Sequence, residues 1–122
     1  MAVVENDPAM LKALERLLRA SGYVSEVFTS AEAFLMRRGA SAVDCLILDI
    51  DLDGISGLSL QKKLVDAGVA PPIIFITGKS DELSRAQATE LGCTAYLRKP
   101  FESKLLLHAV EEALAAPDCE VQ

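Results

Sequence analysis

The sequence predicts an α/β fold in which a parallel sheet is covered by helices on both faces. Short apolar segments alternate with segments of helical spacing along the whole chain. Two of the apolar segments, 43–49 and 73–76, show no polar alternation beyond Asp44, which is typical of strands buried on both faces. Strands of this kind that alternate with helices indicate a parallel sheet between two layers of helices.

The first strand and helix have clear local signals. Residues 2–4 form a short apolar strand, and Asp7 followed by Pro8 is typical of an N-cap with proline at the first helical position. Leucine and methionine side chains then recur at helical spacing until Ser21 and Gly22 end the helix.

The remaining elements follow the same alternation. Residues 24–28 form the second strand, and Ser30 caps a short helix through Arg38, although Ala33 stands where the acid of a full capping box belongs and Glu32 is one position early. Beyond it we expect strands at 43–49, 73–76 and 94–98 and helices at 58–67, 81–91 and 103–115.

Polar residues follow the predicted strands at what would be one edge of the sheet. In open parallel sheets ligands lie beyond the carboxyl ends of the strands, near the point where the strand order reverses. A carboxylate there can attack phosphorus and form an acyl phosphate, and a hard cation, a lysine and a hydroxyl can offset the charge. The ordered set of acids, threonine and lysine favours such chemistry over a group of solvated loop residues: Glu5, Asn6 and Asp7, then residues 49–57 and 77–81, then Lys99, Pro100 and Phe101.

Composition excludes several other classes. The 122 residues fit one domain, and a net charge of −6 argues against binding nucleic acid through its phosphates. No apolar run approaches the roughly 20 residues of a membrane span, and no leader opens the chain, which predicts a soluble, cytoplasmic protein. The scattered Cys45, Cys93 and Cys119 indicate reduced thiols rather than disulfides or a zinc site, with Cys45 in the core.

Four segments together resemble one known family. VVENDP, LILDIDLDGISGL, FITG and YLRKPF, in this order, are similar to the receiver domains of bacterial two-component response regulators, most closely those of the nitrogen-fixation regulator type. The resemblance covers residues 3–114. It implies a flavodoxin-like, doubly wound sheet of five parallel strands in the order 2-1-3-4-5 with five helices, in which residues 1–116 form the receiver and residues 117–122 a tail or the start of a linker.

The resemblance also assigns roles to individual residues. Asp49 is the implied phosphoacceptor, assisted by Thr77 and Lys99, and Thr77 and Tyr96 are the implied switch residues. A cis peptide bond is implied before Pro100. The implied Mg²⁺ ligands are Glu5, Asn6, Asp49 and the backbone carbonyl of Asp51.

Two positions depart from the family pattern. Asn6 stands where the family usually has aspartate, and because this removes a charge, we expect Mg²⁺ to bind weakly. Asp53 stands where proline is usual, which should loosen the loop after the acceptor. Asp51 and Lys79 each lie two residues beyond a site residue, and they either pair across the mouth of the site or point to solvent.

The implied function is a receiver that a sensor histidine kinase phosphorylates on Asp49. Its expected catalysis is limited to self-phosphorylation from phosphodonors and self-dephosphorylation. An output domain or a second copy is expected to bind the face formed by residues 81–91, 94–98 and 103–115.

Two alternatives stay open. Asn6 and Asp53 favour a degenerate receiver that acts as an interaction module without phosphorylation. The order Asp49, Asp51, Thr77 and Lys99 is also similar to haloacid-dehalogenase-type phosphatases, but that family has its Asp-x-Asp motif on the first strand and a further acidic pair after the lysine.

Overall fold

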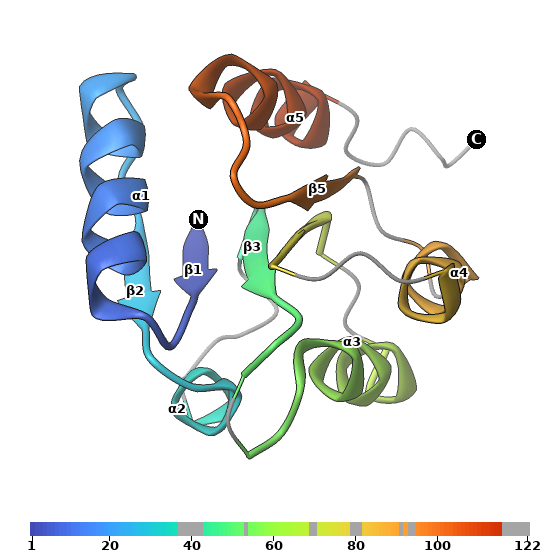
Figure 1. Ribbon diagram of the computed structural model, residues 1–122. Helices are drawn as coiled ribbons and strands as arrows, with labels where there is room; N and C mark the ends of the chain where they lie inside the picture. The colour runs from blue at the N-terminus through green and yellow to red at the C-terminus, as the bar shows by residue number, and fades with distance from the viewer. Residues whose placement is uncertain are drawn as a thin grey trace.

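Five parallel strands form one sheet in the part of the chain that the computed structural model describes, residues 1–36, 43–52, 54–68, 71–78, 82–90, 92 and 95–115 (Figure 1). The order is β2-β1-β3-β4-β5, and each neighbouring pair is parallel. The strands are β1 (Ala2–Val4), β2 (Glu26–Phe28), β3 (Leu46–Asp49), β4 (Ile73–Thr77) and β5 (Ala95–Arg98), and the helices are α1 (Pro8–Ala20), α2 (Ala31–Leu35), α3 (Gly57–Asp66), α4 (Glu82–Glu90) and α5 (Ser103–Ala115). The predicted doubly wound sheet and its strand order are confirmed.

The predicted helix caps are present. The Asp7 carboxylate accepts a hydrogen bond from the Ala9 amide at 3.1 Å, and the Ser30 hydroxyl accepts one from the Ala33 amide at 3.0 Å. Each bond satisfies a backbone donor that has no partner within its helix. The sequence signals therefore predicted the starts of α1 and α2 correctly.

Three predicted elements are longer than the observed ones. Helix α2 ends at Leu35, with the 84% exposed Met36 as its C-cap, whereas the prediction ran to Arg38, which lies outside the described residues. Strands β2 and β3 were predicted to begin at residues 24 and 43. Both begin at the residue paired with Ala2, and Leu46 of β3 is also paired with Ile73, the first residue of β4.

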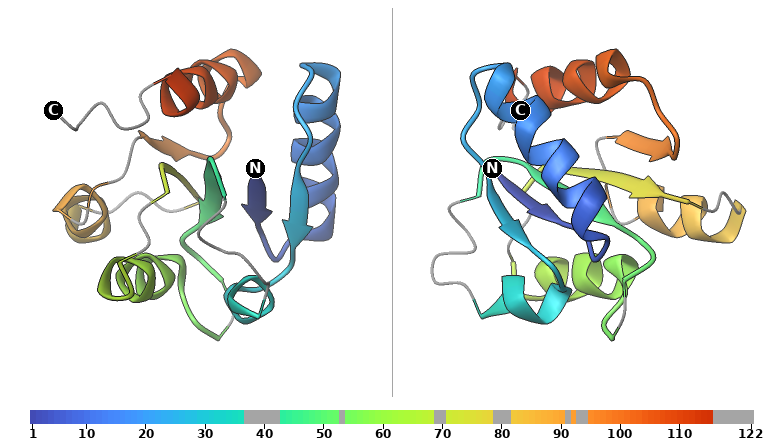
Figure 2. Two further views of the ribbon diagram at one scale, coloured as in Figure 1. Left: turned by 180° about the vertical axis from the view of Figure 1, so that it is seen from behind. Right: turned by 60° about the vertical axis from the view of Figure 1, so that its left-hand side comes forward.

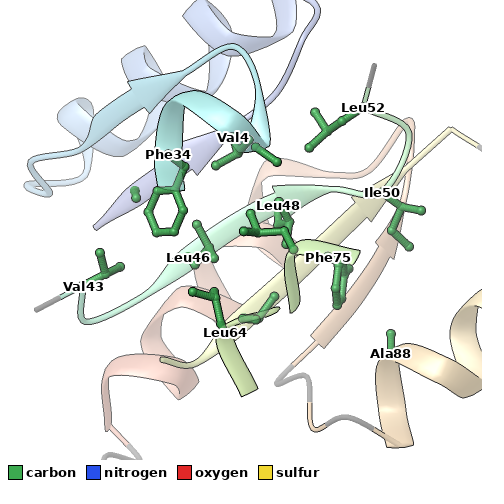
Figure 3. Close-up of a cluster of buried hydrophobic side chains, with 14 residues drawn as sticks. Val4, Phe34, Val43, Leu46, Leu48, Ile50, Leu52, Leu64, Phe75 and Ala88 are labelled. Carbon is green, nitrogen blue, oxygen red and sulfur yellow. The ribbon is translucent and has the colours of Figure 1, made fainter. Parts of the chain in front are cut away.

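Alternate side chains of the strands enter two separate cores. The core under α1 and α5 takes from the strands Val3, Ile47, Ile74 and Ile76, together with Cys45 as predicted. The core under α2, α3 and α4 takes Ala2, Val4, Leu46, Leu48 and Phe75 (Figure 3). The two further views show the same division, with α1 and α5 on one side of the sheet (Figure 2). Because β1, β3 and β4 are buried on both faces, the strand ends that carry polar residues have a rigid base.

No helix within the described residues is long and apolar enough to cross a membrane.

Candidate functional site

The predicted site residues lie at the carboxyl ends of four neighbouring strands. Asp49 and Thr77 are the last residues of β3 and β4, Glu5 directly follows β1, and Lys99 directly follows β5. These strands are adjacent and parallel in the sheet. Their carboxyl ends therefore meet at one edge, as the sequence predicted.

Lys99 joins the two buried acids of the site. Its ammonium donates to Glu5 Oε1 at 2.8 Å and to Asp49 Oδ2 at 3.3 Å. The exposed fractions of Glu5 and Asp49 are 0% and 2%, and the side chain of Lys99 is 20% exposed. Two buried carboxyl groups thus share the ammonium of Lys99.

The crowding of charge changes two pKa values. Burial raises the pKa of the Glu5 carboxyl; the hydrogen bond from Lys99 opposes this shift, and the neighbouring Asp49 adds to it. Burial alone would lower the pKa of Lys99, but the hydrogen bond to Glu5 and the charge of Asp49 outweigh it and raise that pKa. Lys99 is therefore a permanent cation beside the carboxylate of Asp49.

The backbone after Asp49 holds that carboxylate in place. The Asp51 amide donates to Asp49 Oδ1 at 3.0 Å, and the Ile50 amide donates to the Ile76 carbonyl at 3.0 Å. A side chain at Gly57 would collide with the Asp49 carbonyl, so glycine is needed where α3 begins against β3. The Asp49 carboxylate thus has one oxygen on a backbone amide and the other on Lys99.

The switch residues predicted from the resemblance have contacts of their own. The Thr77 hydroxyl donates to Asp51 Oδ2 at 3.0 Å, and the Lys99 amide donates to the Thr77 carbonyl at 2.7 Å. The Tyr96 ring lies 6.4 Å from the Phe75 ring and 5.5 Å from the Arg85 guanidinium carbon, measured to ring centroids. Thr77 thus lies within the site, whereas Tyr96 connects β5 to β4 and α4.

The predicted metal ligands offer oxygen atoms, which suit Mg²⁺, but they carry few negative charges. Receiver domains generally bind Mg²⁺ at the acidic phosphorylation site. Glu5, Asn6, Asp49 and the Asp51 carbonyl would offer oxygen ligands, which hard cations prefer. Within the described part of the chain, however, no three His, Cys, Asp or Glu side chains are grouped to hold a metal. These residues suit a magnesium ion by the chemistry of their oxygen atoms, not by a ready grouping of acids.

A further contact of the site region, besides that of Thr77 with Asp51, was not predicted. Glu32 on α2 accepts a hydrogen bond from the Ile55 amide at 3.1 Å, and a side chain at Gly54 would collide with its carboxylate. Glu32 thereby links α2 to the loop after Asp49. Its only sequence signal was an acid one position early for a capping box.

The cis peptide bond between Lys99 and Pro100 is confirmed. Asp53 and Lys79 lie outside the described residues. Whether Asp51 pairs with Lys79 or both point to solvent therefore stays open, and the Asp51 side chain accepts a hydrogen bond from Thr77.

Comparisons with known proteins show the family of the chain. Residues 1–111 match the response regulator receiver domain family. The chain is 41% identical over 112 residues to the response regulator protein TmoT of Ectopseudomonas mendocina, covering 92% of this chain and 51% of TmoT. It is 35% identical over 112 residues to the transcriptional regulatory protein FixJ of Azorhizobium caulinodans, covering 92% of this chain and 53% of FixJ.

A solved structure of the response regulator StyR superposes with a TM-score of 0.90 at 35% identity, covering 99% of this chain and 61% of that one. The chain spans about half the length of the two curated relatives, TmoT and FixJ. The match to the receiver family leaves the phosphatase alternative without support. With a buried aspartate and a lysine at the sheet edge and a family match over residues 1–111, this chain belongs to the response regulator receiver domains.

Proposed function

We propose that Asp49 accepts a phosphoryl group from the phosphohistidine of a sensor histidine kinase or from a small phosphodonor. The observation that carries this proposal is the Asp49 carboxylate at the buried end of β3, with the Lys99 ammonium 3.3 Å from Oδ2. A carboxylate so placed can attack phosphorus and form an acyl phosphate. Lys99 would then offset the charge that the phosphoryl oxygens bring to the site.

The other residues have supporting roles in the same proposal. Glu5, Asn6, Asp49 and the Asp51 carbonyl would hold Mg²⁺, which when bound supplies positive charge to the phosphoryl oxygens. The hydrogen bond from Lys99 to Glu5 keeps the ammonium at the acceptor in the meantime. Thr77 carries the hydroxyl that would bind the phosphoryl group once it is attached.

Intact-mass measurement after treatment with acetyl phosphate and Mg²⁺ tests the assignment. The wild type should gain one phosphoryl mass, and Asp49→Asn should gain none. Asp66→Asn, which changes an exposed aspartate on α3, is a matched control that should still be labelled. Equal labelling of wild type and Asp49→Asn would remove Asp49 from the role.

Magnesium affinity tests the metal part separately. We propose weak binding, because Asn6 contributes an uncharged oxygen where a carboxylate would contribute charge. Asn6→Asp should tighten Mg²⁺ in a titration followed by calorimetry. Unchanged or weaker affinity in the variant would mean that the side chain at position 6 does not contact the metal.

The proposed partner surface is the face of α4, β5 and α5. Phosphorylation would bias an existing two-state equilibrium at this face, and a second copy of the chain or an output domain would bind there. The relatives TmoT and FixJ are about twice as long as this chain, and FixJ is named a transcriptional regulatory protein. An output domain that regulates transcription is therefore part of the proposal.

A receiver that signals without phosphorylation is the second candidate. Asn6 favours it, because this residue lowers the charge available to a metal. Absence of labelling in the wild type under the conditions above, together with an intact fold, would support this candidate over the first.

A further inference from the structure

Asp51 contacts both the acceptor and the switch hydroxyl. Its backbone amide donates to Asp49 Oδ1 at 3.0 Å, and its side-chain Oδ2 accepts from the Thr77 hydroxyl at 3.0 Å. Thr77 is 1% exposed, whereas Asp51 is an exposed residue at the rim. A buried hydroxyl is thus held by the carboxylate of a surface loop.

A hydroxyl has a single proton to donate. While Thr77 donates it to Asp51, that proton is not available to an oxygen attached to Asp49. Any ligand of Asp49 that needs the Thr77 hydroxyl must therefore compete with the Asp51 carboxylate for it.

The charges around the site favour release once the acceptor is loaded. Among the described residues, the Lys99 ammonium contacts Glu5 and Asp49, and the Asp51 carboxylate contacts the Thr77 hydroxyl. A phosphoryl group on Asp49 adds negative charge next to the Asp51 carboxylate, and like charges in a partly buried site repel each other. The same event thus weakens the hold of Asp51 on Thr77 and offers the hydroxyl a new acceptor.

We propose that Asp51 is a positioning residue that holds the Thr77 hydroxyl on its own carboxylate in the resting domain, and that loading of Asp49 releases it. This inference rests on the proposed function and adds how that site is regulated. The residue at position 51 would then set how strongly the resting state is favoured. Alanine removes the acceptor for the hydroxyl, and asparagine keeps a weaker, neutral one.

Beryllofluoride, a mimic of the phosphoryl group, gives the first measurement. Its dissociation constant in the presence of Mg²⁺ is determined for wild type, Asp51→Asn and Asp51→Ala. The affinity should rise about three- to tenfold in Asp51→Ala, because the hydroxyl is already released, and by a smaller factor in Asp51→Asn. Equal affinity in all three proteins overturns the inference.

A second genetic background separates the effect of the Thr77 hydroxyl from the effect of the Asp51 charge. Removing the Asp51 carboxylate also reduces repulsion of the ligand, whatever Thr77 does. Asp51→Ala is therefore repeated in Thr77→Val, which has no hydroxyl to hold. The gain in affinity should fall to less than half in this background, because the two effects are coupled. The same factor in both backgrounds means that Asp51 acts through charge alone, which overturns the inference.

A measurement without ligand completes the test. Three-bond couplings to the Thr77 methyl carbon report its χ1 rotamer in the unphosphorylated protein. The wild type should show one Thr77 rotamer, and Asp51→Ala should show couplings averaged over several rotamers. Unchanged couplings in Asp51→Ala overturn this inference but leave the proposed function standing. A wild type that neither binds beryllofluoride nor accepts a phosphoryl group overturns the proposed function, and this inference with it.

Discussion

Helices α4 and α5 both border the proposed partner face, but they are attached to the sheet very differently. Helix α5 buries Leu106, Ala109, Val110 and Ala113 in the core that it shares with α1. On α4, Ala88 is the one buried side chain among those that the structure describes, and Leu83 is 78% exposed. The elements that move in a signalling protein come from the least stable part of its structure. If α4, β5 and α5 form the switch face as proposed, we therefore expect α4 to respond more than α5 when Asp49 is phosphorylated, with α5 as its support.

The same substitution on the two helices should have the largest difference in effect. Leu106→Ala on α5 should lower the free energy of unfolding by about 2–5 kcal/mol, because it leaves a cavity in a fully buried position. Leu83→Ala on α4 should change it by no more than about 0.5 kcal/mol, because that side chain is already in water. Urea unfolding of both variants measures this.

The two variants are matched in residue type and secondary structure, so helix propensity cancels between them. Losses of similar size would mean that α4 is packed as firmly as α5.

Amide hydrogen exchange should show the same contrast within one molecule. We expect α4 amides to open at a free energy roughly 2 kcal/mol below that of α5, because few buried apolar contacts hold α4 in place. Beryllofluoride with Mg²⁺ should change exchange in α4 and β5 more than in α1. Changes confined to α1 and α2 would contradict the proposed location of the switch face.

The fold was largely predictable from the sequence because burial on both faces leaves a clear pattern. Segments without polar alternation, such as 73–76, became the inner strands, and the polar residues after them met at one edge. The starts of β2 and β3 were not predictable, because they depend on where the neighbouring strands begin to pair with them. The residue pattern of one segment does not reveal where the strand that pairs with it begins.

The site was predictable in its members but not in its contacts. The order of Glu5, Asp49 and Lys99 indicated which residues would meet, and the structure brings them together. The contact of Glu32 with Ile55 and that of Thr77 with Asp51 span 23 and 26 residues. Such contacts depend on how α2 and the loop are positioned in space, which sequence spacing alone does not reveal.

A smaller effect is expected at the buried glutamine that links α3 to α4. The Gln61 amide donates to the Ala88 carbonyl at 3.2 Å, and its buried Oε1 has no hydrogen-bond partner in the described structure. Gln61→Met keeps a long unbranched side chain and removes both the amide nitrogen and Oε1. Opening of α4 should become easier by about 1 kcal/mol, because the link to Ala88 is lost.

In Gln61→Met, the free energy of global unfolding should fall by less than the free energy of α4 opening. The reason is that the unsatisfied buried oxygen of Gln61 is removed together with the hydrogen bond to Ala88, which offsets part of the loss. Hydrogen exchange and urea unfolding of the same variant give the two values. A global loss as large as the local one would mean that Gln61 supports the whole core.

The smallest expected effect concerns the remaining described contact of α4 with β5. The Arg85 guanidinium carbon lies 5.5 Å from the centroid of the Tyr96 ring, and because Arg85 is exposed, the contact should contribute about 0.5–1 kcal/mol. Arg85→Gln should lower the protection of α4 amides by that amount, and Arg85→Lys, which keeps a cation, by less. Arg16→Gln on α1 is an exposed control that should leave α4 unchanged.

The effect of Arg85→Gln on beryllofluoride affinity then shows in which state the contact exists. A contact made equally in the resting and loaded states shifts no equilibrium between them, whereas one made only at rest opposes loading by its full free energy. If Tyr96 moves as the switch proposal requires, Arg85→Gln should tighten beryllofluoride about two- to fivefold, the factor that corresponds to roughly 0.5–1 kcal/mol. Unchanged affinity together with reduced α4 protection would show that Tyr96 stays beneath Arg85 in both states. Helix α4 would then be loosely attached without being the part that the acceptor controls.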